Sequence, residues 1–298
     1  MWAARNGHLE CVELLIPHES GLKDKGGVTA LMYAAEKGYF ECVELLMDKE
    51  VDLKDNYGST ALMYAALNGH LECVKLLISR EIDLQNQFGG TALMRAASNG
   101  HLECVKLLMN KEVGLKDKNG FTALMWAAMS GHIECIKFLI DKEAGLQNEN
   151  GKTALMYATK YRYIECIELL IDKEAGLQDK EGKSALMNAA GYGRIKCVKI
   201  LVDKDSGLQD KEGKSALMWA AEFGHSQSVR VLRLREASLQ DKEGKSAIMY
   251  AAKKGHRECV KLLMPHEINI KDNNDKSALD YAKNGEIRKL IQDYLKNS

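Results

Sequence analysis

The sequence has little proline, few aromatic residues and no long apolar run, and neither sign of charge is in excess. Only two prolines occur in 298 residues and aromatic residues make up 6%, which is low for a chain long enough to form two ordinary domains. The 42 basic side chains are balanced by 42 acidic ones, so the basic excess that favours nucleic acid or an anionic membrane surface is missing.

Two further absences concern location. No apolar run approaches the length of a membrane span, and the start, Met-Trp-Ala-Ala-Arg, lacks the features of a signal peptide. With 46% hydrophobic and 28% charged residues, the composition is typical of an ordered protein. We therefore expect no nucleic-acid partner, no membrane insertion and a cytoplasmic location.

What the sequence does contain is an internal repeat with a period of 31 residues. A Thr or Ser followed by Ala and then Leu or Ile recurs at this interval along the whole chain, at Thr29, Thr60, Thr91, Thr122, Thr153, Ser184, Ser215, Ser246 and Ser277. One period earlier, Met1 and Trp2 occupy the positions of Met32 and Tyr33, so the chain opens inside a further unit. A fixed period of this length indicates stacked repeats.

Each repeat predicts two short helices. The Thr or Ser is a good N-cap for a first helix over residues such as 30–35, and Gly38 and its equivalents mark the end of that helix, a position that often needs positive φ. A second helix follows, with an apolar stripe that includes Val43 and Leu46. A linker ending in Asp-x-x-Gly, a turn signature, completes the repeat. Such helix pairs bury enough surface only when neighbours stack.

The repeat resembles the ankyrin repeat, in which a turn and the pattern T-P-L-H-x-A precede two antiparallel helices. Gly-His-Leu-Glu at residues 69–72 and the Leu-Leu pair of the second helix complete the match. Ala stands where the family has Pro, Met stands where it has His, and the period is shorter than the usual 33 or so residues. We therefore expect the β-hairpin finger of the family to be reduced to a turn. This Met-rich form is similar to ankyrin arrays of parasitic protists, which occur alone or behind a mitosis-related protein kinase domain.

The predicted fold is an all-α solenoid of about ten stacked helix-turn-helix units. We assign the whole chain, 1–298, to a single array. It has a truncated repeat at 1–25, eight full repeats over 26–273 and a polar capping repeat at 274–298. The first repeat has no polar cap, so we expect its open side to dock on an upstream segment, another domain or another copy. The repeat from Ser215 to Gln240 departs most from the pattern, with Arg233 in an apolar column, and we expect its guanidinium to lie in water.

Cysteine and histidine each occupy one column of the repeat. All eight cysteines share a column in which Ser228 takes the one other place after Cys11. Stacked helices lie roughly 8–10 Å apart, whereas a disulfide needs Cα atoms within about 7 Å, so we expect buried free thiols. Six histidines follow the glycine column, and His-x-Glu-Cys superficially matches a zinc-deaminase motif. The P-C-x-x-C partner is missing and no position gathers three ligands, so we expect no metal.

Nor does the sequence contain a catalytic or cofactor motif. Gly-Lys-Ser or Gly-Lys-Thr, as at 151–153 and 182–184, ends like a phosphate-binding loop, but five residues rather than four separate it from the preceding glycine. The acidic residues fall in columns that we expect on the surface, such as Glu10 and Glu41, and none is paired for acid–base chemistry. We expect no cofactor and no enzymatic activity.

The columns that vary between repeats are the candidates for recognition. The position after the Met carries eight of the 19 aromatic residues, and the turns between 55 and 122 are more apolar than the uniform Asp-Lys-Glu-Gly-Lys-Ser turns after 179. In the ankyrin family, first helices and turns form the concave face that binds partners, and aromatic residues and Arg are common anchors. The candidate protein-binding residues are Tyr33, Tyr57, Tyr64, Phe88, Arg95, Phe121, Trp126, Tyr157 and Trp219. The alternative is that the aromatic column only packs against the neighbouring repeat.

The resemblance implies a protein-interaction scaffold or adaptor whose partner is a protein. Two other interpretations remain open. One is a structural, cytoskeleton-associated protein that assembles end to end through its N-terminal repeat, and the other is the targeting part of a kinase-like parent.

Overall fold

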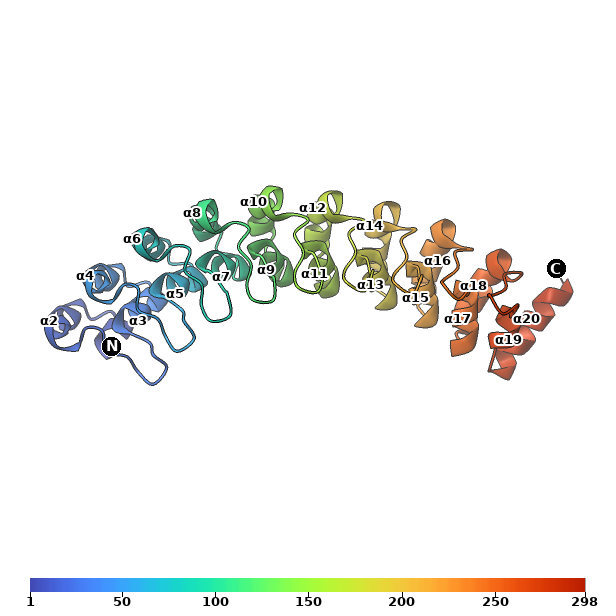
Figure 1. The fold of residues 1–298 in the computed structure, drawn as a ribbon, viewed down its shortest axis with the longest axis horizontal. Coiled ribbons are helices and arrows are strands. Elements are labelled where there is room, and N and C mark those ends of the chain that lie inside the picture. Colours follow the sequence, from blue (N-terminus) through green and yellow to red (C-terminus); the bar gives the residue numbers. More distant parts are fainter. Residues whose placement is uncertain (298) are drawn as a thin grey trace. The chain divides into compact units, whose positions relative to one another are not determined.

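The computed structural model describes residues 1–297, which form two compact units, Met1–Glu149 and the described residues from Asn150 on. In the part of the chain that the structure describes, every regular element is a helix, as predicted, and no strand is present (Figure 1). The first unit contains α1 (Trp2–Arg5), α2 (Leu9–Glu19), α3 (Ala30–Lys37), α4 (Phe40–Glu50), α5 (Ala61–Asn68), α6 (Leu71–Glu81), α7 (Ala92–Ser98), α8 (Leu102–Glu112), α9 (Ala123–Ser130) and α10 (Ile133–Glu143). The second contains α11 (Ala154–Tyr161), α12 (Ile164–Glu174), α13 (Ala185–Gly191), α14 (Ile195–Asp205), α15 (Ala216–Glu222), α16 (Ser226–Glu236), α17 (Ala247–Lys254), α18 (Arg257–Glu267), α19 (Ala278–Tyr281) and α20 (Gly285–Asn297).

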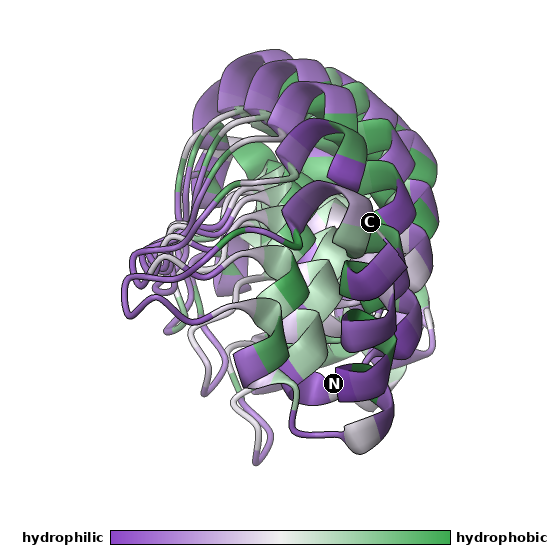
Figure 2. Ribbon diagram, turned by 90° about the vertical axis from the view of Figure 1, so that its right-hand side faces the viewer, coloured by the Kyte–Doolittle hydropathy of each residue, from purple (hydrophilic) through white to green (hydrophobic). Residues whose placement is uncertain are grey.

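Within each unit the helices form two layers of stacked pairs. The first helix of each repeat packs against its own second helix and against the first helix of the next repeat, as α3 does with α4 and α5. Ala34 and Ala35 are fully buried at these contacts, where small side chains let the helices approach closely. Leu31, Val43 and Leu46 fill the space between the layers. Figure 2 shows the result, with hydrophobic residues where the helix layers meet and mostly hydrophilic residues in the projecting turns.

The end of the first helix follows the expected chemistry. Gly38 adopts φ 77° in the left-handed region and terminates α3. A Cβ at Gly38 would also lie 2.4 Å from Nδ1 of His70 in the next repeat, so glycine is required for space as well as for conformation. Nε2 of His70 in turn lies 3.0 Å from the main-chain oxygen of Glu36. This contact joins adjacent repeats.

The N-cap prediction is only partly correct. Thr and Ser residues occupy the N-cap position in extended conformation, but their hydroxyl bonds to the third helical N–H are long, 3.4 Å at Thr29 and 3.3 Å at Thr91. At other repeats no side-chain cap bond forms, at Thr60, Thr153, Ser215 and Ser246. Another group satisfies the start of these helices.

That group is an acidic residue buried at the end of each second helix from α4 to α18. Oε2 of Glu112 accepts a hydrogen bond from the N–H of Leu93 at 2.6 Å, and Oε1 accepts one from the N–H of Asp83 at 3.3 Å. Leu93 lies at the start of α7 in the same repeat, and Asp83 lies in the loop that leaves the preceding second helix. The same contact to the first helix recurs at Glu50, Glu81, Glu143, Glu174, Asp205, Glu236 and Glu267.

The expectation that the acidic columns lie on the surface is therefore wrong for this column. Glu112 is only 1% exposed. Burial raises the pKa of these carboxyls, and the main-chain N–H donors oppose that rise, at Glu81, Glu112, Glu143, Asp205, Glu236 and Glu267. Each carboxyl binds its proton more tightly in the folded chain than in the unfolded chain. This tighter proton binding therefore stabilises the fold most at a pH below the ordinary carboxyl pKa. The stabilisation is lost as the pH rises through the raised pKa of the folded chain.

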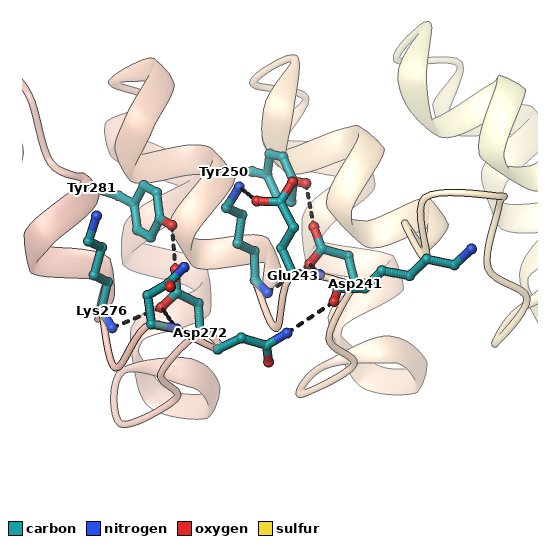
Figure 3. A network of polar contacts seen from close by, with 10 residues as sticks. Asp241, Glu243, Tyr250, Asp272, Lys276 and Tyr281 are labelled. Atoms are coloured by element: carbon teal, nitrogen blue, oxygen red, sulfur yellow. Dashed lines mark hydrogen bonds and ion pairs between the residues drawn. The ribbon is translucent and has the colours of Figure 1, made fainter.

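The turns between repeats are built on a second acidic column. Oδ1 of Asp55 accepts hydrogen bonds from the N–H groups of Tyr57 and Ser59, and the same arrangement recurs in later repeats (Figure 3). Successive turns are joined directly, since the N–H of Lys118 donates to the main-chain oxygen of Phe88 at 2.9 Å. A Cβ at Gly89 would lie 2.7 Å from that nitrogen, so the close approach of two turns requires glycine there. The predicted reduction of the finger to a turn agrees with the absence of strands in residues 1–297.

Arg233 lies at the edge of the core and is partly exposed, which agrees in part with the expectation that its guanidinium lies in water. Its Nη1 makes an exposed contact, 2.7 Å from Nε2 of His266, whereas its Nε is buried without a hydrogen-bond partner.

We predict that Glu112→Ala lowers the free energy of unfolding by about 2 kcal/mol or more, because two main-chain N–H groups lose their acceptor in a buried place. Glu103→Ala is the matched control, since Glu103 lies on the same helix, is exposed and pairs with Lys106. Its loss should stay below about 1 kcal/mol. Urea unfolding of both variants measures the difference. Equal losses would show that the buried carboxylate does not hold the repeat.

The cysteine column gives a second prediction. Seven of the eight free thiols are buried, and burial raises the pKa of Cys73, Cys104, Cys135, Cys166 and Cys259 to about 11. Cys11 is exposed, because α2 has a second-helix neighbour on one side only, α4. Ellman's reagent should therefore react quickly with one thiol in the native protein and with eight in denaturant. Several fast thiols in the native state would contradict this packing.

Candidate functional site

Two neighbouring hollows lie on the face formed by the first helices and turns of the first unit. One has a volume of about 290 Å³ and is lined by Tyr57, Tyr64, Phe88 and Arg95 among others. The second has a volume of about 380 Å³ and is lined by Phe88, Arg95 and Trp126 together with Asn86 and other residues. Because Phe88 and Arg95 line both, we treat the two hollows as one groove, hereafter the first-unit groove.

Exposed aromatic rings border this groove. Tyr57 and Phe88 are 58% and 57% exposed and stack on each other, with ring centroids 6.2 Å apart. Trp126 packs against Phe121 of its own turn at a centroid distance of 5.3 Å. Five of the candidate residues from the sequence, Tyr57, Tyr64, Phe88, Arg95 and Trp126, thus line the groove, and Phe121 supports it.

Most aromatic residues in the position after the Met also have a structural role, whether or not they bind a partner. The hydroxyl of Tyr64 donates to Oδ2 of Asp55 in its own turn at 2.8 Å. Figure 3 shows the same bond in the second unit, between Tyr250 and Asp241 and between Tyr281 and Asp272. These bonds fix the turn on the first helix of its repeat. The alternative expectation of a packing role therefore accounts for part of this column.

One repeat breaks the pattern. Asn86 takes the place of the turn aspartate, and Arg95 takes the place of the aromatic residue nine positions later. Oδ1 of Asn86 accepts from the N–H groups of Phe88 and Gly90, which leaves Nδ2 at the position where most other repeats have an acceptor oxygen. This Nδ2 is buried without a partner, and the Arg95 guanidinium has no hydrogen bond or ion pair among residues 1–297. Where another repeat has a hydrogen-bond donor and an acceptor, Tyr64 and Asp55, this repeat has two donors, Arg95 and Nδ2 of Asn86.

The groove thus contains a cation, Arg95, that forms no ion pair among residues 1–297. Two aspartates also line it, but Asp55 already accepts three hydrogen bonds, and Oδ1 of Asp117 accepts two from its turn. Sequence reasoning singled out Arg95 and missed Asn86. The signal was present in the sequence, since Asn interrupts a column that is mostly Asp.

The other candidate residues lie elsewhere. Tyr33 donates its hydroxyl to Asp24, and the guanidinium of Arg5 lies over its ring. Tyr157 is buried, with 7% of its surface exposed, so it offers no contact area to a partner. Trp219 lines a separate hollow of about 310 Å³ in the second unit. The ammonium groups of Lys183 and Lys214 lie 4.1 and 4.8 Å from its ring centroid.

Comparison with known families agrees with the helix pairs and their turns. A family model described as ankyrin repeats, three copies, matches residues 1–88, 79–147, 93–176, 172–240 and 233–296. The chain belongs to the ankyrin-repeat family. Ankyrin repeats are generally modules for protein–protein interaction, and that is the class of function to which this array belongs. A comparison with curated proteins finds no match.

Metal sites and membrane-spanning helices are the other features of interest. Within residues 1–297 of this ankyrin array, no group of three or more His, Cys, Asp or Glu side chains is placed to hold a metal ion. Among the described helices, none combines the length and the apolar character that a membrane crossing requires.

The unpaired donors give a prediction for stability. Asn86→Asp retains the oxygen that the turn needs and supplies Arg95 with a counter-ion, so the free energy of unfolding should rise by about 1 kcal/mol. The gain should disappear in the double variant Asn86→Asp/Arg95→Gln, and a double-mutant cycle in urea measures it. A gain of the same size without Arg95 would show that the two side chains are not coupled.

Proposed function

We propose that this ankyrin array is a scaffold or adaptor that binds a protein partner in the first-unit groove. The observation that carries the proposal is that two hollows, exposed rings and an unpaired arginine coincide on one face of the first unit. Aromatic residues and arginine supply most of the binding energy at protein interfaces. We further propose that the array acts in the cytoplasm and performs no catalysis.

The chemistry of the groove also suggests the kind of segment that it takes. Tyr57, Phe88 and Trp126 offer apolar ring surface, and Arg95 offers charged donors between the two hollows. An extended segment with one acidic side chain between apolar ones would satisfy Arg95 and cover the rings. Since hollows lie on both sides of Arg95, we favour an internal Asp or Glu over a chain terminus.

The second unit offers less. The two lysines over Trp219 already cover its ring, and Nε1 of Trp219 donates to Asp210 at 2.9 Å. The turns around it carry the uniform charged sequence, so no turn there offers a partner a side chain that distinguishes it from the next turn. Binding by the second unit is therefore not needed to explain its surface.

The test compares two sets of exposed aromatic residues. In Tyr57→Ala/Phe88→Ala/Trp126→Ala the partner should bind at least about 30-fold more weakly, because hot-spot residues typically contribute at least about 2 kcal/mol each. Tyr192→Ala/Phe223→Ala is the control, since these residues are 61% and 52% exposed in the second unit. The partner is first captured with the intact array and then titrated against each variant. Loss of binding in the control variant alone would contradict the proposal.

A second candidate function is end-to-end assembly. It is favoured by the exposed apolar side chains of the first repeat, Trp2 at 72% and Leu14 at 75%. This function predicts particles that grow with concentration in light scattering, and Trp2→Ser/Leu14→Ser should abolish that growth. A constant mass over the concentration range would leave the partner-binding scaffold as the function.

A further inference from the structure

A further hollow, of about 400 Å³, lies in the second unit between the first turns of α12 and α14. Arg162, Arg194 and Lys196 line it, and its other lining residues carry no acidic group. It lies outside the first-unit groove and outside every site described above.

Each of the three cations departs from the pattern of the array at its own position. Arg162 stands in the glycine column, Arg194 in the histidine column and Lys196 in a column that is otherwise mostly glutamate. Each departure adds positive charge, and the three meet at one hollow. Decay of a repeat would not be expected to direct three independent substitutions toward one charge and one place.

Two of the departures are coupled sterically. At Gly38, Gly69, Gly100, Gly193 and Gly224 the histidine of the next repeat leaves no room for a Cβ, as His101 does at Gly69 with a distance of 2.4 Å. Arg162 can carry a side chain because position 194 is not histidine. It still adopts φ 68° in the left-handed region, which is strained for a residue other than glycine. The pair therefore maintains a cation at some cost in backbone energy.

The cations are held in place but not neutralised. Nη1 of Arg194 donates to the main-chain oxygens of Thr159 and Lys160 at the end of α11, which fixes the guanidinium. Its Nε is buried without a partner. The side chains of Arg162 and Lys196 make no hydrogen bond or ion pair within residues 1–297. Burial lowers the pKa of Arg194, and the nearby charge of Arg162 lowers it further.

The start of α14 adds to the positive potential. This helix has 11 residues, no side-chain cap bond at its N-terminus and no acidic residue in its first turn, where most second helices of the array carry a glutamate. Free N–H groups and the helix dipole favour an anion at such an end. Here Lys196 occupies the place of that glutamate.

We propose that Arg162, Arg194, Lys196 and the N-terminus of α14 form a binding site for a phosphate group. A phosphate oxygen can accept from the fixed guanidinium while its charge neutralises the two free cations, and arginine suits this geometry. The group is either free phosphate or a phosphorylated side chain. The site differs from the Gly-Lys-Ser and Gly-Lys-Thr turns, whose lysines lie in the turns and not in this hollow.

The experiment titrates the whole chain with two probes, inorganic phosphate and N-acetyl-O-phosphoserine amide, and follows the Nε–Hε signals of arginine by NMR. In the unchanged protein the signals of Arg162 and Arg194 should shift and saturate. Saturation by both probes supports a phosphorylated side chain as ligand, and saturation by phosphate alone supports the free anion. Saturation by neither overturns the proposal.

The variants restore the array's own residues, so each should fold. Lys196→Glu and Arg162→Gly/Arg194→His should each weaken binding about tenfold or more, because each removes a charge-assisted contact. Lys199→Glu is the matched control: the charge change is the same, on the same helix, and Glu168 already occupies that column one repeat earlier. A control that weakens binding as much as Lys196→Glu would show a general charge effect and overturn the site. None of these variants alters the first-unit groove.

Discussion

The buried carboxylate at the end of the second helices from α4 to α18 is the interaction on which the rest of each unit depends. One side chain accepts from the start of its own first helix and from the loop that leaves the preceding repeat, so it sets the position of the turn between them. These turns carry aromatic and charged side chains that line the first-unit groove. Burying an acid is costly, and here main-chain donors offset much of that cost. Surface recognition therefore rests on a polar contact in the interior.

Much of the fold could be predicted because the same residue types recur at the same positions in every repeat. Gly38 and its equivalents showed where first helices end, and the left-handed conformation of Gly38 bears this out. The buried role of Glu112 could not be predicted in the same way. A glutamate near the end of an amphipathic helix looks solvated, and its partners, Leu93 and Asp83, lie 19 and 29 residues earlier in the chain. The packing of the two helices of one repeat brings Leu93 to Glu112, and the stacking of repeats brings Asp83 there.

The site was predicted in part for a related reason. Exposed rings at turn tips, such as Tyr57 and Phe88, can be located from the turn pattern alone, and both border the groove. The importance of Asn86 depends on a bond that the array normally makes, from Tyr64 to Asp55, which the sequence does not reveal. Likewise, Arg162 and Arg194 are single departures in sequence and become a cluster only in space. In a repeat protein, the effect of a residue that departs from the pattern can be inferred once the contact made at that position in the other repeats is known.

Hydrogen exchange on the array bound to its captured partner tests the central claim most directly, since it reports which main-chain amides a partner covers. The account predicts slower exchange at the turns 55–59, 86–90 and 117–121 and at the starts of the first helices that follow them. The second helices of the first unit should exchange as in the free array. Slowing confined to the second unit, or to the second helices, would contradict binding in the first-unit groove.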